Sequence, residues 1–230
     1  MPTVRKPRLE SQAETRAHLL DAAGPLFELG GFHRTSVAEI ARAAGYTTGA
    51  IYSNFPRKED LALAVLERNA AADWERLDIE LAKSTDLTDR LVAVITWRRR
   101  ILAINEPIGI LHLELYLYAL QDAELRAALV ASQRDQQTRV GLILEQVAAD
   151  AGATLTVDAE VLAAALLATA DGTAIVNSLD PSSNQAEAFA WTLATLVANS
   201  MRPRPVADDA WTTFVDRLLT AAVDPEAPLG

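Results

Sequence analysis

Residues 35–55 read TSVAEIARAAGYTTGAIYSNF, which is the spacing of two short helices that cross at a tight turn. Two helices approach closely only where a small residue faces the partner helix and the turn between them accepts a positive φ. Ala41 and Gly45, four residues apart, meet these two needs. The apolar seam that would fix the crossing consists of Val37, Ile40, Ala44 and Ile51. The pattern predicts a helix-turn-helix, whose second helix is offered to the major groove of DNA.

Capping and breaking residues bound the helices around this motif. Ser36 and Glu39 have the spacing of a capping box at a helix start. Gly30 and Gly31 offer a left-handed residue at a helix end, and Pro56 marks a further boundary. Together with the apolar periodicity, these signals predict helices at residues 11–29, 37–44, 48–54 and 58–83.

Hydroxyl groups, a glycine and a lysine lie where a helix-turn-helix meets DNA. Thr47, Thr48 and Gly49 open the second helix, where side chains and backbone come closest to base edges. Tyr52 and Asn54 follow at positions suited to phosphates on either side of the groove. Further polar residues lie at helix starts, where free N–H groups bind phosphate. The predicted DNA-binding residues are Thr35, Ser36, Thr47, Thr48, Gly49, Ala50, Tyr52, Asn54 and Lys58.

The motif belongs to a longer run, residues 31–61, that resembles the DNA-binding domain of the TetR family. The shared pieces are Gly-Phe, Thr-Ser-Val, Ile-Ala, Ala-Gly-Tyr-Thr, Gly-Ala-Ile-Tyr, Phe and Lys-Glu-Asp-Leu. The ending Ile51-Tyr-x-x-Phe-x-x-Lys58 is particularly characteristic, and residues 19–27 resemble the family's first helix. One departure is Asn54, where the family usually has histidine; asparagine can also bind phosphate.

The resemblance implies an all-α fold with two domains. An N-terminal three-helix helix-turn-helix domain is expected at residues 10–56, after a flexible basic arm at residues 1–9. A larger helical ligand-binding and dimerisation domain is expected at residues 57–224. The implied protein is a homodimer that binds a palindromic operator on double-stranded DNA and is released by a small-molecule effector. Repression is the expected mode, and activation stays open.

Helical periodicity continues through the rest of the chain, with further helices predicted at residues 87–104, 108–120, 122–151, 157–178, 185–201 and 207–223. The resemblance implies that the dimer is built from the helices at residues 157–178 and 185–201. Small side chains allow helices to approach closely. Alanines recur on both helices, namely Ala163, Ala164, Ala168, Ala190, Ala194 and Ala198. Ordinary packing within one chain is the alternative reading of these alanines.

Aromatic residues with a few polar groups are candidates for an effector pocket among the middle helices. Small-molecule sites are usually lined in this way. The candidate residues are Trp74, Trp97, His112, Tyr116 and Asn177. Each of them taken singly is more often part of a core, and His112 is equally consistent with a surface position. Such a lining favours an apolar or aromatic ligand with one or two polar groups.

Charge and composition are consistent with a DNA-binding head on an acidic body. The net charge is −10, but residues 1–60 carry eight Lys/Arg against seven Asp/Glu, and the rest carry 13 against 24. The acidic body favours contact with DNA through the head alone. The chain has no cysteine, which fits a reducing cytoplasm, and no apolar run of spanning length. We therefore expect a cytoplasmic protein without a membrane segment, cofactor or metal.

Two other classes of protein compete with this interpretation. An enzyme is disfavoured because the three histidines, His18, His33 and His112, form no His-Glu-x-x-His motif, and no Gly-x-Ser-x-Gly or phosphate-loop pattern is present. A purely structural helical protein with a vestigial helix-turn-helix would not need the turn glycine or the hydroxyl and lysine groups at phosphate positions. Specific DNA binding separates the regulator from both alternatives.

Overall fold

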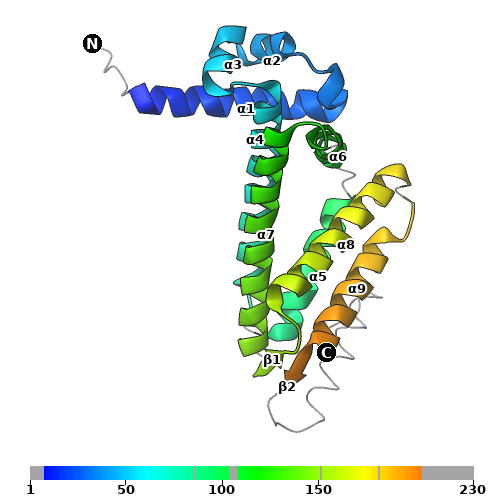
Figure 1. The fold of residues 1–230 in the computed structure, drawn as a ribbon. Helices are drawn as coiled ribbons and strands as arrows, with labels where there is room; N and C mark the ends of the chain where they lie inside the picture. Colours follow the sequence, from blue (N-terminus) through cyan, green and yellow to red (C-terminus); the bar gives the residue numbers. More distant parts are fainter. Residues whose placement is uncertain (1–7, 85, 104–107, 151, 181, 204–230) are drawn as a thin grey trace. The chain divides into compact units, whose positions relative to one another are not determined.

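The computed structural model describes residues 8–84, 86–103, 108–150, 152–180 and 182–203 (Figure 1). Over these ranges the chain forms nine helices and one two-stranded sheet. The helices are α1 Arg8–Arg34, α2 Val37–Ala44, α3 Thr48–Asn54, α4 Lys58–Leu81, α5 Leu87–Ala103, α6 Ile108–Ala119, α7 Ala123–Asp150, α8 Ala159–Leu179 and α9 Gln185–Ser200. The strands are β1 Ala153–Leu155 and β2 Met201–Pro203. The predicted all-α class is confirmed, and the helix predicted at residues 207–223 lies outside the described residues.

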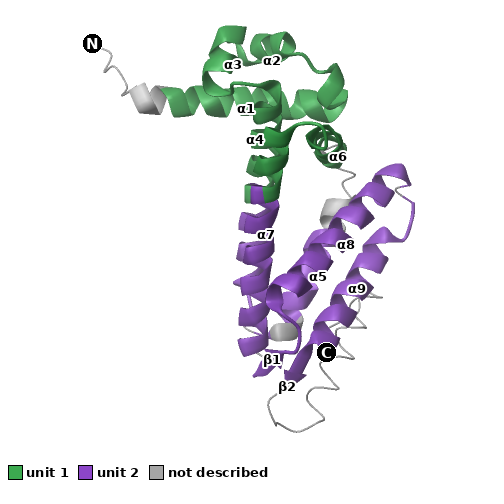
Figure 2. Cartoon of the chain, viewed as in Figure 1, with its two compact units in different colours: residues 1–71, 107–130 green, residues 72–106, 131–230 purple. Residues whose placement is uncertain are grey.

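Two compact units make up the chain, and each combines segments that are distant in sequence (Figure 2). Unit 1 consists of residues 1–71 and 107–130, so it joins α1–α3 and the start of α4 to α6 and the start of α7. Unit 2 consists of residues 72–106 and 131–230. The predicted boundary at residue 56 follows the motif. The packing unit also takes in α6, because Leu111 and Leu115 are buried in the same core as α1–α3.

Local capping chemistry defines α2 and α3. Ser36 Oγ accepts from the Glu39 N–H at 3.2 Å, and the Ser36 N–H donates to the Glu39 carboxylate at 2.8 Å. Gly45 closes α2 in the left-handed conformation, with φ 74°. Thr47 then caps α3 by accepting from the Ala50 N–H at 3.2 Å. Both helices begin and end where the sequence predicts.

An apolar core holds the helix-turn-helix against α1. Ile40 of α2 and Ile51 of α3 are fully buried, and Ala41 is 3% exposed where the helices approach. These residues share a core with Phe27 of α1 and Phe55. Burial of one large aliphatic side chain stabilises a fold by about 1.5–3 kcal/mol. Burial of the two isoleucines therefore contributes about 3–6 kcal/mol to the free energy that holds α2 and α3 in place.

Gly31 breaks α1 one turn before its end. Its φ of 71° and ψ of 174° lie in a region that is almost restricted to glycine. The break frees the N–H of Phe32, which donates to Glu114 Oε2 of α6 at 2.5 Å. A Cβ on Gly31 would lie 3.0 Å from both carboxylate oxygens of Glu114. Glycine is thus required here both by the backbone conformation and by the close approach of α6.

The largest differences between the predicted and the observed elements lie in α1 and in the two strands, and other helix limits differ by one or two residues. α1 spans residues 8–34 rather than 11–29, since one more helical turn follows the break. Residues 8–9 of the predicted arm are therefore helical, and residues 1–7 lie outside the described residues. β1 and β2 pair antiparallel, with Thr154 opposite Arg202, although no strand was predicted. Strands of three residues are too short to produce a recognisable alternation.

Alanines form much of the contact between α8 and α9 in unit 2. Ala163, Ala190 and Ala194 are fully buried. Ala198 is 9% exposed and belongs to the same core. Only Ala164 and Ala168 of the six predicted interface alanines are exposed. Most of these small residues therefore serve close packing within one chain, which was the alternative reading.

Gly31→Ala is expected to lower the free energy of unfolding by about 2 kcal/mol, because alanine meets both a forbidden φ and the Glu114 carboxylate. Gly45→Ala is the matched control: its φ is also positive, but a Cβ there meets nothing within 4 Å. Urea unfolding of both variants measures the difference. A loss at Gly31 no larger than that at Gly45 would contradict the role given to the α6 contact.

Candidate nucleic-acid interface

The first turn of α3 is exposed, whereas its inner face is buried. Thr47, Thr48 and Gly49 are exposed, and Tyr52 is 52% exposed. Ile51 points into the core of unit 1, where it is fully buried. Burial of one face fixes the rotation of α3 about its own axis. The opposite face is therefore presented in a defined orientation, which a groove-reading helix needs.

Gly49 is not required by the fold. A Cβ added at this position would meet only Thr47 Oγ1, at 3.7 Å, which is an ordinary van der Waals contact. Its φ is not in the positive region, so the backbone also accepts other residues. A glycine that the domain itself does not need leaves space on the exposed surface for a close external approach.

Other predicted phosphate-binding groups are engaged within unit 1. Thr35 is 5% exposed, and its hydroxyl donates to the carbonyls of Leu26 and Gly31 at 2.9 and 2.8 Å. The hydroxyl hydrogen is already used, so we expect Thr35 to support the turn. The Asn54 amide donates to the Ala50 carbonyl at 2.8 Å. Ser36 is exposed, although its hydroxyl donates to Glu39.

Lys58 begins α4, as predicted, but its side chain is half-buried. Its Nζ lies 4.2 Å above the centre of the Phe32 ring, a cation–π contact. Burial lowers the pKa of Lys58, and the charges of Glu59 and Glu114 oppose that shift. The ammonium group therefore lies over Phe32, within the influence of the Glu114 charge on α6.

Arg16 lies beside the end of α3, although it is not among the DNA-binding residues predicted from the sequence. Its guanidinium donates to the Asn54 carbonyl at the end of α3, at 3.1 Å, and lies 4.1 Å above the Phe55 ring. The side chain is exposed on α1, so its charge lies beside the end of α3. Arg42 on α2 is also exposed. The sequence gives no signal for the contact between Arg16 and the end of α3, because this contact depends on how the two helices pack.

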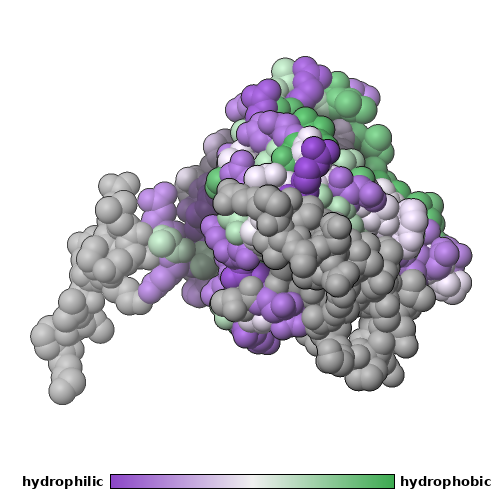
Figure 3. Space-filling model, turned by 90° about the horizontal axis from the view of Figure 1, so that it is seen from below, coloured by the Kyte–Doolittle hydropathy of each residue, from purple (hydrophilic) through white to green (hydrophobic). Residues whose placement is uncertain are grey.

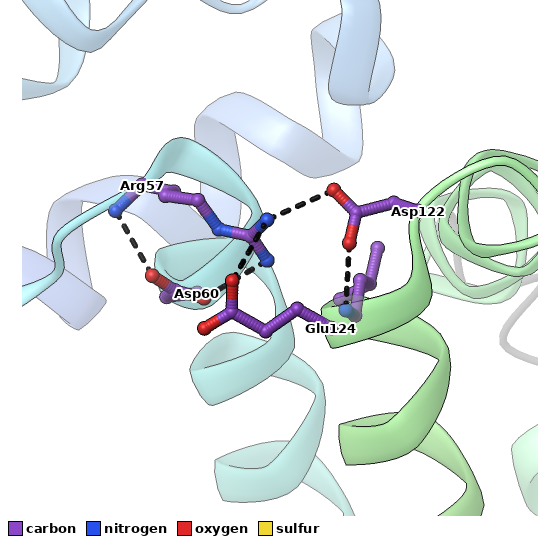
Figure 4. Close-up of polar contacts among 5 residues, drawn as sticks. Arg57, Asp60, Asp122 and Glu124 are labelled. Carbon is purple, nitrogen blue, oxygen red and sulfur yellow. Dashed lines mark hydrogen bonds and ion pairs between the residues drawn. The ribbon is translucent and has the colours of Figure 1, made fainter.

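An ion pair joins the starts of α4 and α7 (Figure 4). Arg57 donates to Asp122 Oδ2 at 2.8 Å, and its backbone N–H donates to Asp60 at 2.9 Å. Asp122 Oδ1 accepts from the Leu125 N–H at 2.8 Å and so caps α7. This backbone hydrogen bond, assisted by Arg57, holds the pKa of Asp122 below its usual value. Both helices thus begin at one charged cluster, which Glu124 joins.

Two of the predicted pocket residues stack in unit 2. The rings of Trp74 on α4 and Trp97 on α5 are 6.4 Å apart and inclined by 27°. The Arg139 guanidinium lies 5.1 Å from the Trp74 ring. Trp97 Nε1 is buried and has no hydrogen-bond partner. A buried indole N–H normally finds an acceptor, so this donor is an unusual feature.

Charged groups flank the tryptophan pair on the same two helices. Burial raises the pKa of Asp73, and the charges of Arg76 and Arg98 oppose the shift. Arg98 donates to the Ala170 carbonyl of α8 and lies 5.5 Å from the Phe189 ring of α9. Aromatic surface and polar groups from α4, α5, α8 and α9 are therefore combined within unit 2.

The other predicted pocket residues lie elsewhere. His112 and Tyr116 contact each other on α6, with ring centres 4.3 Å apart, and Tyr116 packs on the core of unit 1. Asn177 is 7% exposed on α8 in unit 2. The five predicted residues thus belong to two different compact units.

The fold and the exposed second helix define a helix-turn-helix DNA-binding protein. A family model for bacterial regulatory proteins of the tetR family matches residues 19–65. The HTH-type transcriptional regulator AcrR of Shigella flexneri is 51% identical over 63 residues, which are 27% of this chain and 29% of that protein. This match therefore spans less than a third of the relative's length.

Solved structures match over a larger part of the chain. A TetR transcriptional regulator from Chloroflexus aurantiacus J-10-FL has a TM-score of 0.66 at 25% identity, covering 85% of this chain and 100% of that one. FadR of Bacillus subtilis, solved in complex with stearoyl-CoA, has a TM-score of 0.64 at 22% identity, covering 79% and 97%. Residues 19–65 thus match the TetR family of bacterial regulatory proteins, which confirms the resemblance seen in the sequence, and the solved regulators share the fold of most of the chain.

Proposed function

We propose that this chain is a cytoplasmic, ligand-responsive transcription regulator, acting as a repressor that binds a palindromic operator as a homodimer. The observation that carries the proposal is the exposed first turn of α3, held on a capped helix-turn-helix whose inner face is fully buried. Thr47, Thr48, Gly49 and Ala50 read base edges in this proposal. Ser36, Tyr52, Asn54 and Lys58 bind phosphates. Two of the relatives, AcrR and TtgR, are HTH-type transcriptional regulators.

Thr48→Ala is expected to change the ranking of DNA sites, because Thr48 reaches base edges. Tyr52→Phe is expected to weaken binding to all sites alike, since it removes only a hydroxyl that binds phosphate. Fluorescence anisotropy on a panel of duplexes enriched from a random pool measures both effects. Uniform weakening by Thr48→Ala together with a changed ranking by Tyr52→Phe would reverse these roles.

The homodimer is proposed from an apolar stripe on α8. Val161, Ile175, Val176 and Leu179 are 60%, 39%, 43% and 82% exposed. They share a helix face with exposed Ala164, Ala168 and Gly172, at spacings of three and four residues. On the face drawn in Figure 3, the largest hydrophobic area lies at the upper right, with smaller areas elsewhere. An apolar face of this extent is unusual on a monomer.

A second copy of the chain is the occupant that fits this stripe. The exposed residues of the stripe carry no charge, although the chain as a whole carries −10 and two copies repel elsewhere. The small residues at its centre allow two α8 helices to cross closely. By length and composition alone, α8 is also long and apolar enough to cross a membrane. This is weak evidence for a membrane span, because the other face of α8 packs on α9.

Ala168→Glu is expected to convert the dimer into a monomer, because it places a charge at the centre of the stripe. Ala131→Glu makes the same exchange at an exposed site on α7 and is expected to leave the dimer intact. Light scattering at micromolar concentration measures both masses. A wild-type monomer, or a dimer that survives Ala168→Glu, would contradict the assigned interface.

The effector site is proposed at the Trp74–Trp97 pair of unit 2. FadR of Bacillus subtilis, which shares the fold, is described with bound stearoyl-CoA. In this chain the unpartnered Trp97 N–H favours an apolar or aromatic ligand that carries a hydrogen-bond acceptor. A ligand releases DNA only if it binds the DNA-free conformation more tightly than the DNA-bound one.

Trp97→Phe is expected to weaken binding of such a ligand about tenfold, because one hydrogen bond is lost while the ring remains. DNA affinity is expected to stay unchanged. Trp74→Phe is the matched control, since the indole nitrogen of Trp74 is not a buried donor that lacks a hydrogen-bond partner. Tryptophan quenching measures ligand affinity, and anisotropy measures DNA release. Equal losses in both variants, or a ligand that binds without releasing DNA, would contradict the proposed site.

A further inference from the structure

Glu114 on α6 contacts the DNA-binding segment at the break in α1. Its carboxylate accepts the Phe32 N–H at 2.5 Å, and a Cβ on Gly31 would lie only 3.0 Å from its oxygens. The Phe32 side chain is 2% exposed and packs on Tyr118 of the same helix, with ring centres 5.7 Å apart. One residue, Phe32, is thus held by α6 through both its backbone and its ring.

Lys58 meets the same residue from the start of α4. Its ammonium lies 4.2 Å above the Phe32 ring, and the Glu114 charge favours its charged form. Other titratable groups at this junction are Glu59, next to Lys58 in sequence, Tyr118, which hydrogen-bonds to Glu59, and His33, whose ring centre lies 5.4 Å from that of Phe32. Phe32 therefore has the Glu114 carboxylate at its N–H and the Lys58 cation over its ring.

We propose that Glu114 is a positioning residue that limits DNA affinity by holding the Lys58 ammonium at the α1–α6 junction, where it competes with DNA phosphate for this cation. The inference rests on the proposed phosphate-binding role of Lys58. To reach a phosphate, Lys58 leaves the Phe32 ring and the neighbourhood of a negative charge. Both losses oppose DNA binding, and the attraction between opposite charges is strongest at low salt.

Glu114→Gln separates this role from simple support of the fold. Glutamine has nearly the same shape and keeps an oxygen that accepts the Phe32 N–H, but it carries no charge. A structural role predicts unchanged or weaker DNA binding. Competition for Lys58 predicts tighter DNA binding, by about two- to fivefold at low salt. The interaction between two charges near the protein surface has a free energy of this size.

The experiment measures affinity of the full-length chain for a random-sequence DNA duplex at several salt concentrations. Phosphate contacts do not depend on sequence, so no operator is needed. Glu114→Gln, Lys58→Ala and the double variant form a thermodynamic cycle. Glu145→Gln, at an exposed position on α7, is the control for the loss of one negative charge. The gain expected from Glu114→Gln disappears in the Lys58→Ala background.

Phe32→Leu provides a second test if Glu114→Gln unfolds. It removes the ring beneath Lys58 and keeps both the backbone N–H and an apolar side chain in the core. Tighter binding that depends on Lys58 supports the proposal. A Glu114→Gln affinity equal to that of Glu145→Gln, weaker binding, or a gain that persists without Lys58 overturns it. If the wild-type protein binds no DNA at all, the proposed function itself is wrong.

Discussion

The ion pair between Arg57 and Asp122 joins the starts of the two helices that continue from unit 1 into unit 2. α4 and α7 both cross the boundary between the units, near residues 71 and 130. Each partner also takes part in the cap of its own helix, because the Arg57 N–H donates to Asp60 and Asp122 accepts the Leu125 N–H. A shift of α4 against α7 within unit 1 breaks this ion pair, whereas each cap lies within one helix. In the proposed function, this coupling makes the DNA-binding unit respond as one body to changes in either helix.

The DNA-binding unit is built from more than the helix-turn-helix. α6 supplies Leu111 and Leu115 to the core and Glu114 to the break in α1. An effector that acts through unit 2 changes DNA affinity only by the difference in its affinity for the two conformations. Within unit 1, the Glu114 charge that acts on Lys58 lies on α6 rather than on the reading helix.

Sequence alone predicts the parts of this fold that depend on local chemistry. The limits of α2 and α3 follow from Ser36, Glu39, Gly45 and Thr47, whose roles are set within a few residues. The break at Gly31, the buried hydroxyl of Thr35 and the grouping of His112 and Tyr116 with unit 1 depend on contacts distant in sequence. The five predicted pocket residues lie in two different units for the same reason. Aromatic residues with similar periodicity pack into different cores, so the tryptophan pair and Asn177 lie in unit 2 and the other two residues in unit 1.

Hydroxyl-radical footprinting on an enriched DNA site tests the central claim most directly, because it reports the reading helix and the dimer at once. The account predicts two protected patches related by two-fold symmetry, with centres separated by about one helical turn of DNA or somewhat more. Substitution of Thr48 is expected to alter protection in both patches equally. A single patch, protection without two-fold symmetry, or an absence of protection would contradict a homodimer that reads DNA with α3.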